Sequence, residues 1–143
     1  MSERALRIAA ALVALAGLAV AGYLTWAHYA DSSVLCPVGG GCETVQESRY
    51  AEIAGVPVAL LGVLGYGAIL ALLAWDGPTA RLGAAMLALT GLLFSAYLLV
   101  MQLFVIDALC TWCVVNDVVI APALAVLTAL RLRAEERGQT RGV

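Results

Sequence analysis

Charged residues are scarce in this chain: they make up 13% of its 143 residues, whereas an average soluble domain has about 25%. Apolar residues make up 63%, against about 45–50% in a soluble domain, and the mean hydropathy is +0.95. This excess is too large for the core of one domain of this length, so the composition predicts an integral membrane protein. The basic residues are eight arginines and no lysine, and the net charge of −2 argues against a nucleic-acid partner.

Alternation of polar and apolar residues is absent from the long apolar runs, which argues against the strands of a membrane barrel. The runs have the length of membrane-spanning helices, which need about 20 apolar residues each. The predicted fold is all-α: a single domain over residues 1–143, in which four transmembrane helices form a bundle, with spans at about residues 8–27, 56–75, 82–106 and 111–130. The first run also fits a cleavable signal peptide, and this alternative stays open.

Seven of the eight arginines fall on one side of the membrane if the four spans alternate in direction. Two precede the first span, one lies between the second and third spans, and four follow the last; only Arg49 falls on the other side. The positive-inside rule then predicts that both termini are cytoplasmic, in the inner membrane of the cell. Residues 28–55 and 107–112 are expected to face outward, and the tail 131–143 to be a solvated cytoplasmic end.

The four cysteines form two pairs, and the predicted topology places both pairs at the outward face. Cys110 and Cys113 form a C-x-x-C at the expected start of the fourth helix, where the positive end of the helix dipole favours thiolate. Cys36 and Cys42 enclose three glycines, which suits a mobile pair better than a rigid staple. Sulfurs that can reach each other in turn predict a thiol–disulfide relay. Two static disulfides, or a zinc site made from all four cysteines, stay open as alternatives.

The outward loop is expected to carry a short helix on the membrane surface over residues 43–54. Its apolar positions include Val45, Tyr50 and Ile53, and such a segment can lie in the interface with its apolar side against the lipid. Cys42 would then lie near the start of this helix.

These motifs together resemble the vitamin K epoxide reductase family in its bacterial form. The matching motifs, in the order of the family, are Cys36-Pro37, Gly41-Cys42, Ser48, Gly55-Val56-Pro57-Val58-Ala59-Leu60-Leu61-Gly62, and the pair Cys110 and Cys113. The resemblance covers nearly the whole chain. The C-x-x-C follows the third span, which separates this chain from the other bacterial quinone-linked disulfide-forming protein, where it lies in the first external loop.

The resemblance implies a bundle around a quinone, menaquinone or ubiquinone, that accepts electrons, with no metal site. Cys36 and Cys42 would exchange with a periplasmic or other extracytoplasmic thioredoxin-like partner. Cys42 would then attack the inner pair at Cys110, and Cys113 would pass the electrons to the quinone. Ser48 would help to orient the cysteines and the quinone. Only 13 residues follow the last predicted span, too few for the thioredoxin domain of some relatives, so the partner is expected to be a separate protein.

Two positions depart from the animal enzymes of this family. Asp117 stands where those enzymes have a tyrosine, and Val58 stands where they have an asparagine. Both are candidate quinone contacts, and the departures favour plain quinone reduction. Reduction of a quinone epoxide, or a membrane scaffold or transporter with structural disulfides, remain alternatives. Asp117 either gives a hydrogen bond or proton to a quinone oxygen or reaches the membrane interface as a helix-end polar residue.

Overall fold

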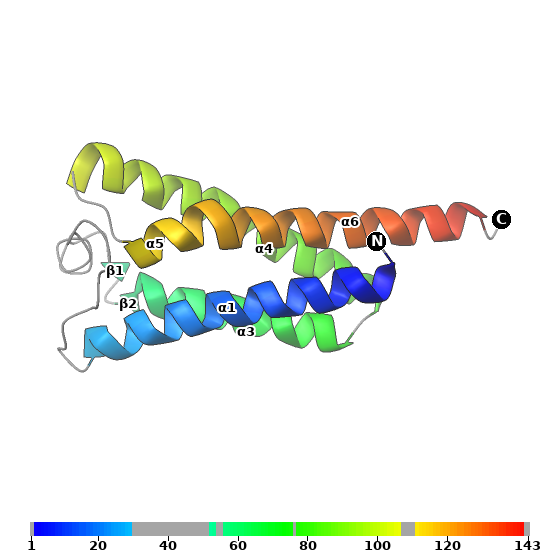
Figure 1. Ribbon diagram of the computed structural model, residues 1–143, viewed down its shortest axis with the longest axis horizontal. Coiled ribbons are helices and arrows are strands. Elements are labelled where there is room, and N and C mark those ends of the chain that lie inside the picture. The colour runs from blue at the N-terminus through cyan, green and yellow to red at the C-terminus, as the bar shows by residue number, and fades with distance from the viewer. Residues whose placement is uncertain (1, 30–51, 54–55, 76, 107–110, 142–143) are drawn as a thin grey trace.

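A computed structural model describes residues 2–29, 52–53, 56–75, 77–106 and 111–141 of the chain. The helices are α1 (Glu3–Tyr29), α3 (Val58–Trp75), α4 (Pro78–Val100) with the π-helix η2 (Met101–Ile106), and α5 (Thr111–Val115) with the π-helix η3 (Asn116–Ile120) and α6 (Ala121–Arg141) (Figure 1). In the described part of the chain, four helical stretches are long and apolar enough to cross a membrane. The predicted four-helix transmembrane bundle is therefore confirmed.

Two short strands precede α3. Strand β1 (Glu52–Ile53) pairs antiparallel with β2 (Val56–Pro57). The surface helix expected over residues 43–54 is wrong at residues 52–53, which are extended, while residues 43–51 and 54 lie outside the described part of the chain. The second span becomes helical at Val58 rather than at residue 56. Proline disfavours a helical backbone for the residue before it, so Val56 stays extended and pairs with β1.

The long helices form a ring in the order α1, α3, α4 and α6, in which each packs against two neighbours. Both termini, the end of α3 and the start of α4 lie at one end of the bundle (Figure 1). The end of α1 and the starts of α3 and α5 lie at the opposite end. The helices thus alternate in direction, as the predicted charge asymmetry requires.

Small residues recur at intervals of three, four or seven positions on the buried faces of two helices. They are Ala10, Ala14, Gly17 and Ala21 on α1, and Ala80, Ala84, Ala88 and Ser95 on α4. Small side chains let membrane helices approach closely. Large apolar side chains point outward instead, with Leu93 65% and Phe104 79% exposed. This distribution is the reverse of that in a water-soluble protein and fits lipid as the solvent.

Ion pairs connect the helices at the end of the bundle that holds both termini. Arg131 Nη2 donates to Glu3 Oε1 at 3.0 Å, and Arg81 Nη2 lies 3.2 Å from the same oxygen. Arg81 also lies 3.8 Å from Glu135. The expectation of a solvated tail from residue 131 is wrong at its first residue, because Arg131 is 1% exposed and α6 continues to Arg141. The Glu3 carboxylate offsets part of the cost of burying this guanidinium.

Arg7 joins α1 to α3 at the same end of the bundle. Its Nε donates to the carbonyl oxygen of Leu73 at 2.9 Å, and its Nη2 donates to that of Ala74 at 3.1 Å. Both carbonyls belong to the last turn of α3, where backbone acceptors have no partner within the helix. The arginine therefore caps α3 and interacts favourably with its dipole.

Replacing Arg131 by alanine is expected to lower the free energy of unfolding in detergent by about 1–2 kcal/mol, because the buried guanidinium is lost while Glu3 is partly exposed and keeps Arg81 as a partner. Arg133→Ala is the matched control, since Arg133 is exposed on the same helix. The control should change stability by less than about 0.5 kcal/mol. Chemical or thermal unfolding of both variants gives the comparison, and equal losses would contradict a stabilising role for the Arg131–Glu3 pair.

Candidate functional site

Cys113 lies in the first turn of α5, which begins at Thr111, directly after Cys110. The predicted helix start within the C-x-x-C is therefore confirmed. The Cys113 side chain is partly buried and lines a cavity inside the bundle. The other predicted site residues Cys36, Cys42, Ser48 and Cys110 lie outside the described part of the chain.

The cavity lies among the four helices and measures about 190 Å³. Much of its wall is apolar and includes Leu24 of α1, Ile69 of α3 and Leu98 of α4. Val58, at the start of α3, also lines it, as does Asp117 of η3. The structure thus brings together three residues that the sequence analysis singled out: Cys113, Val58 and Asp117.

Five polar side chains form a hydrogen-bonded group beside this cavity, which we call the polar cluster: Tyr66, Ser95, Gln102, Asn116 and Asp117. The Tyr66 hydroxyl donates to Asn116 Oδ1. Asn116 Nδ2 donates to Asp117 Oδ1 at 3.1 Å and to Ser95 Oγ at 3.4 Å. Gln102 Nε2 donates to Asp117 Oδ2 at 3.3 Å. Because lipid offers no hydrogen-bond partners, these bonds lower the cost of burying the five side chains.

Both π-helical segments carry members of the polar cluster. Gln102 lies in η2, and Asn116 and Asp117 open η3. The backbone N–H of Ala121 donates to the carbonyl of Asn116, five residues earlier, which is the π pattern. Single π turns inside longer helices are rare, but those that occur often lie at functional sites. Two of them on facing helices, each with a polar cluster residue, mark this region as the candidate site.

Asp117 is only 6% exposed, so its interpretation as a helix-end residue that reaches the membrane interface is wrong. Each carboxyl oxygen accepts a hydrogen bond from a neutral side-chain amide, Oδ1 from Asn116 and Oδ2 from Gln102. The two amides hold the carboxyl group inside the bundle. The side chain is therefore available to the cavity rather than to the membrane surface.

Tyr66 and Ser95 are site residues that the sequence did not reveal. Tyr66 lies between glycines of α3, and Ser95 is one of the small residues that an apolar span tolerates. One signal was available: Ser95 and Gln102 are seven residues apart, a spacing that places both on one face of a helix. Tyr66 and Asn116 both line the cavity, so the fold brings a tyrosine and an asparagine to it.

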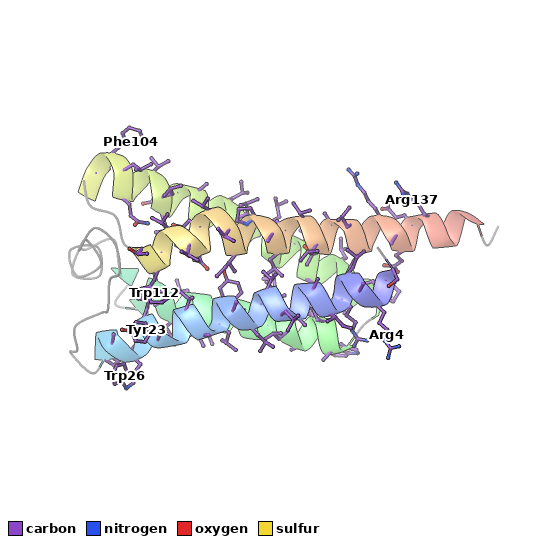
Figure 2. The ribbon with its side chains drawn as sticks, in the orientation of Figure 1. Arg4, Tyr23, Trp26, Phe104, Trp112 and Arg137 are labelled. Carbon is purple, nitrogen blue, oxygen red and sulfur yellow. The ribbon has the colours of Figure 1, made fainter. Side chains whose placement is uncertain are left out.

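Trp112, between the two cysteines of the C-x-x-C, packs against α1. Its ring meets that of Tyr23 edge to face, with centroids 5.8 Å apart, and Tyr23 in turn stacks with Trp26 at 6.4 Å. Figure 2 shows Tyr23 and Trp112 facing each other, while Trp26 points away from the bundle. An aromatic pair of this kind contributes about 0.5–1.5 kcal/mol beyond its buried area. The contact fixes the start of α5, and with it Cys113, against the end of α1.

Gly17 on α1 provides space for the Tyr66 ring, because a Cβ added there would lie 2.5 Å from Cζ of Tyr66. Gly17→Ala is therefore expected to displace the ring and to lower the free energy of unfolding by about 1–3 kcal/mol. Gly22→Ala is the control on the same helix, since nothing lies within 4 Å of its added Cβ. Thermal unfolding should leave the Gly22 variant as stable as the parent or slightly more so. A Gly17 variant as stable as the Gly22 variant would contradict this close contact.

Known proteins match much of the chain that forms this site. The model of the Vitamin K epoxide reductase family matches residues 8–128, a range that includes Cys113 and the whole polar cluster. The curated protein Thiol-disulfide oxidoreductase LTO1 of Arabidopsis thaliana is 43% identical over 51 residues. That alignment covers 35% of this chain and 14% of the Arabidopsis protein, a small part of the length of that relative. Because the family match extends over far more than half of the sequence, the chain belongs to the vitamin K epoxide reductase family.

Proposed function

We propose that this protein is a membrane thiol–disulfide oxidoreductase that oxidises a thioredoxin-like partner and passes the electrons to a quinone. The observation that carries the proposal is the position of Cys113, which lies in the first turn of α5 and lines an apolar cavity with the polar cluster at its side. The matched segment of the Arabidopsis protein, which is named a thiol-disulfide oxidoreductase, supports the same chemistry.

The cavity fits a quinone in size and in the character of its wall. An apolar protein cavity of about 150 Å³ is large enough to hold a benzene ring, and this one measures about 190 Å³. Val58 and Phe94 would contact the apolar faces of the ring, and Asn116 and Asp117 would face its oxygens. When bound, the quinone accepts two electrons and two protons. A lipid-soluble acceptor suits a site that lies inside the membrane bundle.

The cysteines carry the electrons by thiol–disulfide exchange. In our proposal the partner thiolate attacks the outer disulfide at Cys36, and the Cys42 thiolate leaves. Cys42 then attacks Cys110 of the inner disulfide, and Cys113 leaves as a thiolate beside the cavity. The positive end of α5 stabilises this thiolate, which makes Cys113 the better leaving group of the inner pair. Ser48 is proposed to orient the reacting groups.

The direction of the protein in the membrane follows from its arginines. We propose that both termini are cytoplasmic and that the cysteine-bearing end faces the periplasm or another extracytoplasmic space, because positive residues favour the cytoplasmic side. The described arginines at the end with the termini include Arg4 and Arg137, which Figure 2 shows near the two chain ends. A water-soluble partner and a membrane-soluble quinone, menaquinone or ubiquinone, would then meet the protein at the same face.

The test is anaerobic mixing of the fully reduced protein with a soluble quinone analogue, followed by mapping of the disulfides. The parent is expected to be reoxidised while quinol appears in equal amount. Cys113→Ala should abolish quinol formation, because the last sulfur of the relay is missing. Cys36→Ala should lose oxidation of a thioredoxin-like partner but keep quinone reduction driven by a small dithiol.

Two outcomes would contradict the proposal. If the cysteines stay bridged and quinone has no effect on reduced protein, the disulfides are structural. If Cys36→Ala and Cys113→Ala behave identically with a small dithiol, the division of roles between the outer and inner pairs is wrong. The alanine variant of Thr90 is a suitable control, because this exposed side chain bonds, among the described residues, to the carbonyl of Met86 in its own helix.

A further inference from the structure

The reaction proposed above moves protons as well as electrons. Oxidation of two thiols to a disulfide releases two electrons and two protons, and reduction of a quinone to a quinol takes up two of each. Inside a membrane bundle these protons need a group that can hold them between release and uptake. We propose that the Asp117 carboxyl is the proton carrier of the cavity and that Gln102 and Asn116 position it; this role rests on the function proposed above.

Asp117 has the place that this role requires. It lies four residues after Cys113, and both residues line the same cavity. The two protons that the partner thiols release reach an Asp117 carboxyl oxygen one at a time, and the carboxyl group releases each of them to an oxygen of the acceptor. The second proton follows the same route after the first has been delivered. The carboxyl group thereby returns to its starting form, and the protons released equal those consumed.

Gln102 and Asn116 act through Asp117 rather than on the reacting atoms. Gln102 is 2% exposed and reaches from η2 to the Oδ2 atom of Asp117, while Asn116 bonds Oδ1. With one amide donor on each oxygen, rotation of the carboxyl group is restricted. Amides do not exchange protons with a carboxylate, so they orient the group without removing its function.

Few other side chains around Asp117 could carry the proton. The described residues that line the cavity include no arginine or histidine. The other ionisable side chains among them are Tyr66 of α3 and Cys113 of α5. Tyr66 gives its hydroxyl proton to the hydrogen bond with Asn116, so it supports the positioning residue. Among the described residues that line the cavity, three side chains can thus exchange a proton: the Asp117 carboxyl, the Cys113 thiol and the Tyr66 phenol.

Infrared spectroscopy of quinone-free protein provides a measurement that does not depend on turnover. Reduction of the cysteines should change the carbonyl stretch of a carboxylic acid, and this change should be absent in Asp117→Asn. Gln102→Leu should keep the change but shift its frequency, because one hydrogen bond to the carboxyl is lost. A purely structural role for Gln102 in joining η2 to η3 would leave the frequency unaltered.

Kinetics with a soluble quinone analogue test the same roles. Asp117→Asn is expected to lower kcat about 100-fold, as loss of a general acid–base group does, with the KM for quinone nearly unchanged. Gln102→Leu should lower kcat about tenfold, because a misplaced carboxyl transfers its proton less efficiently. Thr128→Val is the control, since Thr128 is equally buried but bonds only to carbonyls of its own helix and does not line the cavity.

The outcomes separate this inference from the function on which it rests. Unchanged kcat in Asp117→Asn, or no carboxyl change when the cysteines are reduced, would overturn the proton carrier. The same carboxyl frequency in Gln102→Leu and in the parent would overturn the positioning role. If quinone fails to reoxidise the parent protein, the proposed function is wrong, and the infrared measurement still decides whether the Asp117 carboxyl changes its protonation when the cysteines are reduced.

Discussion

Hydrocarbon provides no partners for hydrogen bonds, and this constraint decides where the polar side chains of this protein lie. Among the described residues, polar side chains that bond to side chains of other helices gather in two places. At one end of the bundle Arg131 and Glu3 pair across α6 and α1. Toward the other end the polar cluster connects α3, α4 with η2, and η3 through bonds such as that between Gln102 and Asp117. Elsewhere on the bundle many large apolar side chains are exposed, such as Leu93 and Phe104, which fits a lipid surrounding.

The two polar regions have different consequences. The ion pairs connect charges of opposite sign and hold α1, α4 and α6 together near both chain termini. The polar cluster contains one acidic side chain, Asp117, surrounded by neutral donors, and it borders the cavity that Cys113 also lines. The ion pairs stabilise the bundle. The polar cluster keeps a group that can exchange a proton next to a sulfur, which suits redox chemistry.

Helix packing and helix irregularity together form the cavity. Small residues such as Gly17 let α1 approach α3 and leave space for the Tyr66 ring, so that the tyrosine reaches Asn116 on the opposite side. The π turns η2 and η3 carry Gln102 and Asp117. The aromatic contact of Trp112 with Tyr23 then fixes the helix on which Cys113 lies. Each of these contacts joins segments that are far apart in the sequence, and the site depends on all of them.

The sequence by itself determined the four membrane spans, the helix start after Cys110 and the family, because apolar length, helix-end chemistry and motif order are local properties. It also selected Val58 and Asp117. Only the tertiary structure decided that Arg131 is buried and that Tyr66 bonds to Asn116, 50 residues away. An apolar run reports that a helix prefers lipid, but not how that helix is rotated or which polar side chain it meets. Rotation and partners follow from the packing of all four helices together.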